Sequence, residues 1–121
     1  MNAINMNEVI RKLPDLPEGY NELNDLLIKK IMKQNIKIFV LDDDPTGVQT
    51  VNNIPVLTVW DEESIRSAFL EKANLIYILT NSRGLKAKDA EHINSVIAER
   101  ICNISLETGK AFKIISRSDS T

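Results

Sequence analysis

The sequence is poor in the residues that mark several common kinds of site. Its single cysteine, Cys102, cannot form an internal disulfide, and alone it cannot build a thiolate metal centre. The four glycines are scattered, so the phosphate-binding patterns G-x-G-x-x-G and G-x-x-x-x-G-K-[ST] are absent. No His/Cys cluster offers a zinc site. We therefore predict no metal site and no cradle for a nucleoside triphosphate in these residues.

Long apolar runs and clustered basic residues are also lacking. No apolar run approaches the roughly 20 residues that span a bilayer, and the first residues lack a basic segment followed by an apolar one. The 15 basic and 17 acidic side chains give a net charge of −2, and the basic ones form no block. Nucleic-acid binding needs such clusters to neutralise phosphates. We therefore expect a cytoplasmic chain without membrane or nucleic-acid partners.

What remains is an ordinary globular composition, with 43% hydrophobic and 26% charged residues in 121 positions. Residues 1–35 are predicted to form an N-terminal arm followed by a helix. Two prolines in the first 20 residues indicate the arm. From Asn21, a plausible N-cap, apolar residues recur every fourth position to near Gln34, which is typical of an amphipathic helix; they are Leu23, Leu27 and Ile31.

Residues 36–121 alternate between short apolar runs and helical patterns. The runs at 36–41, 54–60, 75–79 and 111–115 are rich in β-branched residues and read as buried strands. A helix is expected after the N-cap Asp61, and a longer one from about Ala90 to the terminating Gly109. This order predicts an α/β fold: a mostly parallel sheet with helices on both faces, Rossmann-like and three-layered but incomplete.

Polar clusters follow three of these runs, at 42–47, 80–84 and 116–121. The carboxyl ends of parallel strands lie at one edge of a sheet, where open α/β folds bind their ligands. Any one cluster alone is also explained by turn formation. Together they predict a small-molecule site whose candidate binding residues are Asp42, Asp43, Asp44, Thr46, Asn81, Ser82, Arg83, Ser116, Arg117, Ser118 and Asp119.

The three adjacent carboxylates at 42–44 repel one another and need compensation. Arg83, Arg117, a bound Mg²⁺ or the hydroxyls of a substrate could each supply it. Pro45 and Gly47 are expected to form a tight turn that leaves backbone N–H groups free to face a ligand. Carboxylates accept from hydroxyls and a guanidinium grips a carboxylate, so the mixture suits a small polyhydroxylated anion.

The strand-end motifs VLDDDPTG at 40–47, YILTNSR at 77–83 and SRSDST at 116–121 resemble one known family. Over residues 36–121 the chain is similar to the sugar-binding N-terminal domain of the four-carbon acid sugar kinases. The resemblance implies phosphorylation of threonate, erythronate or a 3-oxo-tetronate. ATP and Mg²⁺ would come with the nucleotide-binding C-terminal domain. Asp43 and Asp44 are the catalytic candidates, one of which would orient or deprotonate the attacking hydroxyl, while Arg83 or Arg117 anchors the carboxylate.

The chain departs from that family in length. It stops at Thr121 without the nucleotide-binding domain, so we expect either a fragment or the product of a truncated gene, inactive by itself. A sheet without its later strands would expose an unpaired edge and allow homo-oligomerisation.

Two other functions fit parts of the pattern. Asp42, Asp44 and Thr46 satisfy the D-x-D-x-T pattern of Mg²⁺-dependent phosphatases of the haloacid dehalogenase type. Asp42 would then be the nucleophile and Asp44 the acid/base. The third function is that of a non-catalytic remnant that binds a small acid.

Overall fold

The computed structural model describes residues 5–118 and divides into two units, residues 1–33 and 34–121. The first unit contains α1 (Met6–Ile10) and α2 (Tyr20–Gln34), neither of which has a buried residue. The sequence analysis expected Asn21 to be the N-cap of this helix, but Asn21 lies inside α2. The short helix α1 was not predicted.

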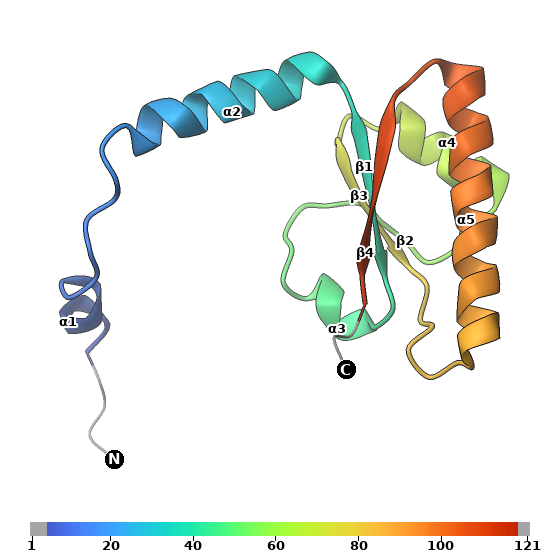
Figure 1. Ribbon diagram of the computed structural model, residues 1–121, viewed down its shortest axis with the longest axis horizontal. Helices are drawn as coiled ribbons and strands as arrows, with labels where there is room; N and C mark the ends of the chain where they lie inside the picture. Colours follow the sequence, from blue (N-terminus) through green and yellow to red (C-terminus); the bar gives the residue numbers. More distant parts are fainter. Residues whose placement is uncertain (1–4, 119–121) are drawn as a thin grey trace. The chain divides into compact units, whose positions relative to one another are not determined.

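The second unit is built on a four-stranded, all-parallel sheet in the order β2-β3-β1-β4 (Figure 1). Its strands are β1 (Lys37–Asp42), β2 (Val56–Leu57), β3 (Leu75–Leu79) and β4 (Phe112–Arg117). The predicted α/β class and parallel sheet are confirmed. The run at 54–60 gives only two strand residues, at an edge of the sheet next to Pro55, whose missing N–H is tolerated there.

Two helices cover one face of this sheet (Figure 1). α4 (Glu62–Leu70) begins at Asp61, whose carboxylate accepts from the N–H of Ser64, and α5 (Ala87–Thr108) ends at Gly109 in the left-handed conformation. Both boundaries match the sequence prediction closely. Alternate residues of β1 and β3 pack against the helices in a single core, composed of Phe39, Leu41, Ile65, Ala68, Phe69, Ile76, Ile78, Ile97, Ile101 and Ile104.

The strand order explains this uneven coverage. The connections from β2 to β3 and from β3 to β4 move the same way across the sheet, so right-handed crossovers place α4 and α5 on the same face. The connection from β1 to β2 moves the opposite way and carries only α3 (Pro45–Val48). Among the described residues of the second unit, the layer opposite α4 and α5 is therefore thin, which agrees with the incomplete three-layer arrangement expected.

The amino end of the sheet is held by a buried lysine. The Lys37 side chain is buried, and its Nζ donates to the carbonyl oxygens of Glu71, at 2.5 Å, and Ala73, at 2.7 Å, where the chain leaves α4. Burial lowers the pKa of Lys37 because it disfavours the charged form. These contacts lie at the end of β1 opposite to Asp42, so they stabilise the scaffold and leave the carboxyl edge to the candidate site.

Candidate functional site

The carboxyl ends of the strands meet as the sequence predicts. In the sheet register Asp42 at the end of β1 pairs with Leu79 of β3 on one side and with Arg117 of β4 on the other. The chain after β1 turns to one face of the sheet, and the chain after β3 leads to α5 on the other face. This divergence defines a topological switch point between β1 and β3, the place where open α/β sheets form a crevice.

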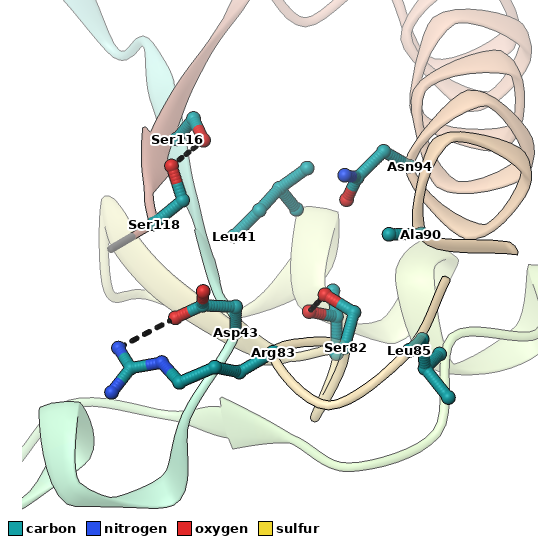
Figure 2. Close-up of a pocket in the computed structure, with 10 residues that line it drawn as sticks. Leu41, Asp43, Ser82, Arg83, Leu85, Ala90, Asn94, Ser116 and Ser118 are labelled. Atoms are coloured by element: carbon teal, nitrogen blue, oxygen red, sulfur yellow. Dashed lines mark hydrogen bonds and ion pairs between the residues drawn. The ribbon is translucent and has the colours of Figure 1, made fainter. Parts of the chain in front are cut away.

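A cavity of about 210 Å³ lies at this point (Figure 2). Five of the predicted site residues line it: Asp43, Ser82, Arg83, Ser116 and Ser118. Pockets for drug-sized ligands are usually about 300–1,000 Å³, so this one suits a smaller molecule. Hydroxyls and one ion pair dominate its polar lining, which is a surface for a hydroxyl-rich ligand.

The three adjacent carboxylates do not all converge on one place. Asp42 is fully buried, and its Oδ2 accepts from Nη1 of Arg117 at 3.0 Å. Asp43 lines the cavity. Asp44 caps α3 by accepting from the N–H of Thr46 at 2.7 Å and from its hydroxyl at 2.6 Å. The sequence analysis left open which groups compensate the repulsion between these carboxylates. The structure shows pairing with Arg83 and Arg117.

Arg83 joins two of these carboxylates. Its Nη2 lies 3.0 Å from Oδ1 of Asp43, and its Nη1 lies 2.9 Å from Oδ2 of Asp44. Its backbone N–H also donates to the carbonyl oxygen of Asp43, which ties the loop after β3 to the loop after β1. The side chain is 44% exposed and lines the cavity.

Hydrogen bonds from Thr46, followed by the nearby charge of Arg83, lower the pKa of Asp44 below its ordinary value of 3.8. A carboxyl group with a depressed pKa in the folded state stabilises the fold above its unfolded pKa. That stabilisation is lost as the pH falls through the folded value. We expect the free energy of unfolding of the wild type to exceed that of Asp44→Asn above pH 4, and the difference to shrink below pH 3.8.

Urea denaturation between pH 2 and 6 measures this difference. Thr46→Val, which removes the hydroxyl but keeps the backbone donor, should give an intermediate pH dependence. A difference between wild type and Asp44→Asn that is the same at every pH would contradict the assignment.

Two buried hydroxyl side chains that hydrogen-bond to each other also line the cavity. The hydroxyls of Thr80 and Ser82 lie 2.9 Å apart, and Thr80 also donates from its backbone and its hydroxyl to the carbonyl oxygen of Asp42. Between them, Asn81 adopts a positive φ of 50°, which an asparagine tolerates better than most residues. Thr80 and Ser82 are buried while Asn81 is exposed.

Other predicted residues lie near the cavity without lining it. Asp42 and Arg117 form the ion pair beneath it, and Asp44 and Thr46 form the cap of α3. Asn81 lines a separate pocket with Pro45, Thr58, Trp60, Leu79 and Thr80. Asp119 lies outside the described residues.

Sequence reasoning missed the helical wall of the cavity. Ala90 and Asn94 of α5 form one side of it, with Leu85 at the preceding loop (Figure 2). Their spacing of four residues places both on the same face of the helix. An alanine and an asparagine at this spacing in the predicted helix were the available signal, but a polar helical residue is usually a solvated one.

No group of three His, Cys, Asp or Glu side chains between residues 5 and 118 is arranged to hold a metal ion. The phosphatase alternative also requires an accessible nucleophile at Asp42. That side chain is 0% exposed and is paired with Arg117, so a phosphate cannot reach it without rearrangement. The burial of Asp42 therefore argues against this alternative.

The family described as "Sugar-binding N-terminal domain" matches residues 38–121. No curated protein and no solved structure gave a match. Within the described part of the chain, no helix combines the length and the apolar character needed to cross a membrane. The family match covers all four strands except Lys37, the first residue of β1, and it includes every residue that lines the cavity.

Proposed function

The chain belongs to the family of sugar-binding N-terminal domains, and we propose that it is the substrate-binding portion of an ATP-dependent four-carbon acid sugar kinase. The proposed substrates are threonate, erythronate or a 3-oxo-tetronate. The observation that carries the proposal is the small hydroxyl-lined cavity at the switch point of the sheet, with Asp43 and Arg83 on its wall. The similarity of the strand-end motifs to those of the kinase family supports the same substrate class.

The two ends of a tetronate differ chemically, and so do the groups around the cavity. Hydroxyl groups of the ligand could donate to the carboxylate of Asp43 and exchange hydrogen bonds with Ser82, Ser116 and Ser118. Arg83 is the cation that lines the cavity and would bind the carboxylate. In this arrangement the ligand carboxylate shares the guanidinium with Asp43 and Asp44.

Phosphoryl transfer depends mostly on positioning and on charge neutralisation. Asp43 is the acidic residue on the cavity wall, so we assign it the role of accepting a hydrogen bond from the attacking hydroxyl. Asp44 is engaged by Thr46 and Arg83 and is given a positioning role, because it fixes the guanidinium that lies beside Asp43. The two catalytic candidates, Asp43 and Asp44, are thereby given different functions.

The described residues do not fit ATP or Mg²⁺. The sequence lacks a glycine-rich phosphate loop, and the three carboxylates of the acidic triplet are paired with arginines, Asp42 with Arg117 and the other two with Arg83. The proposal therefore assigns the nucleotide and its metal ion to a separate nucleotide-binding domain.

The test is a thermal and urea denaturation series of the full 121-residue chain with threonate, erythronate and 3-oxo-tetronate. Erythritol, a neutral four-carbon polyol, is the control ligand. A specific ligand at a hundredfold excess over its Kd should stabilise the fold by about 2.7 kcal/mol. At least one tetronate should do so, and erythritol should not.

The same preparation separates this proposal from its rivals. Absence of stabilisation by every tetronate would overturn the substrate assignment. Hydrolysis of a phosphate ester by the chain with Mg²⁺ would overturn it in favour of the phosphatase.

A further inference from the structure

The two buried hydroxyls of the cavity hydrogen-bond in a direction that their chemistry fixes. The Thr80 hydroxyl lies 3.0 Å from the carbonyl oxygen of Asp42, which can only accept, so the single hydroxyl proton of Thr80 points to that oxygen. The Ser82 hydroxyl lies 2.9 Å from Oγ1 of Thr80, and by distance alone either atom could be the donor. Because the Thr80 proton is already used, Ser82 is the donor of this second bond.

The Ser82 hydroxyl therefore has lone pairs but no proton to offer a ligand. The residue lines the cavity and is only 7% exposed. Since its one proton is donated to Thr80, its oxygen can act towards a ligand only as an acceptor. The carboxylate of Asp43, which also lines the cavity, is likewise an acceptor. This part of the cavity thus favours ligand groups that donate hydrogen bonds.

The order of the polar groups along the cavity indicates which part of a tetronate would lie at Ser82. Figure 2 shows the carboxylate of Asp43 between the guanidinium of Arg83 and the side chain of Ser82. When Arg83 binds the ligand carboxylate, C2 stays beside Arg83, because it is bonded directly to the carboxylate carbon. The rest of the ligand then runs past Asp43 towards Ser82. The hydroxyl on C3 is the next group that can reach the Ser82 oxygen.

On the basis of the proposed function, we propose that Ser82 selects a hydroxyl over a carbonyl at C3, so that the chain binds threonate or erythronate in preference to a 3-oxo-tetronate. A C3 hydroxyl can donate to Oγ of Ser82. A C3 carbonyl cannot donate, and its oxygen would face another acceptor. Sites built to hydrogen-bond a ligand hydroxyl reject analogues that lack it, because the polar group of the site is left unpaired. Thr80 is a positioning residue, since it acts through Ser82.

Calorimetric titration of the full chain with threonate, erythronate, 3-oxo-tetronate and 3-deoxytetronate tests the selection. The 3-deoxy acid lacks the C3 hydroxyl without adding a carbonyl. The better of the two hydroxylated acids should bind about tenfold or more tightly than either analogue. Equal affinity for either analogue would overturn the selection by Ser82 and leave the proposed function standing. Binding of none of the four acids would instead overturn the proposed function, and the selection with it.

Three variants test the role of the Thr80 hydroxyl. Thr80→Val keeps the shape and the backbone N–H that donates to Asp42, but it frees the Ser82 proton to donate to a ligand carbonyl. The ratio of the dissociation constants of 3-oxo-tetronate and the hydroxylated acid should fall by about fivefold or more. Thr80→Ser should keep the wild-type ratio. So should the matched control Thr108→Val, whose lost hydroxyl donates to the carbonyl oxygen of Ile104, at the far end of α5 from the cavity. An unchanged ratio in Thr80→Val would overturn the proposal.

Discussion

Replacement of Gly47 by alanine is expected to lower the free energy of unfolding by about 3 kcal/mol. A Cβ at this position would lie 1.6 Å from Nη1 of Arg117 and 2.0 Å from Oδ2 of Asp42. The arginine is flexible and partly exposed and can move away, but the short, buried aspartate cannot. Its ion pair would break and leave a buried carboxylate unpaired, which costs about 3–5 kcal/mol. The lower end applies because Arg117 is 43% exposed.

The sign of this effect is informative, since Gly47 lies in the helix α3, where alanine has the better intrinsic propensity by about 1 kcal/mol. Gly84→Ala is the matched control, because a Cβ there meets nothing within 4 Å. It should change stability by less than about 0.5 kcal/mol. In an Arg117→Ala background the cost of Gly47→Ala should fall, and urea denaturation of the four chains gives the coupling. An additive result would contradict the assigned cause.

Asp43→Asn is expected to weaken tetronate binding at least tenfold while the fold persists. The side chain of Asp43 lines the cavity and pairs with Arg83. The substitution replaces its carboxylate by a neutral amide, so the ligand hydroxyl loses a charged hydrogen-bond acceptor. Hydrogen bonds to charged groups contribute about 1.5–3 kcal/mol, which corresponds to about 10- to 150-fold in Kd. Calorimetric titration with the stabilising tetronate measures the change.

Asp25→Asn, the same substitution on the exposed surface of α2, should bind like the wild type. Arg83→Ala should also weaken binding, and more strongly for a tetronate than for any neutral polyol that binds. Wild-type affinity in both Asp43→Asn and Arg83→Ala would remove these residues from the site.

Much of the second unit could be predicted from the sequence because local signals and the fold agree there. The apolar runs of β1 and β3, the N-cap Asp61 and the terminating Gly109 gave element boundaries to within a few residues. The coverage of the sheet could not be predicted in the same way. Strands with apolar residues on both faces suggest two helical layers, whereas the distribution of helices depends on the strand order, which periodicity does not encode.

The candidate site could also be predicted only in part from the sequence. The rule that parallel strands end at one edge correctly brought the loops after β1, β3 and β4 together. It could not say that Asp42 would pair with Arg117 while Asp43 and Asp44 share Arg83, because that depends on side-chain direction at the strand end. Gly47 was interpreted as a turn former with free N–H groups beyond it. In the structure the N–H groups of Thr50 and Val51 beyond it donate to the carbonyl oxygens of Gly47 and Val48, so that prediction is wrong. The missing side chain of Gly47 makes room for an ion pair.

The measurement that bears most directly on the proposed site is a ¹H–¹⁵N correlation spectrum of the 121-residue chain titrated with threonate or erythronate. If the tetronate binds in the proposed site, we expect saturable shifts at the amides of Asp43, Ser82, Arg83 and Ser116. The indole signal of Trp60 in the neighbouring pocket should stay unchanged. Shifts confined to Trp60 and its surroundings, or none at the strand ends at saturating tetronate, would contradict it.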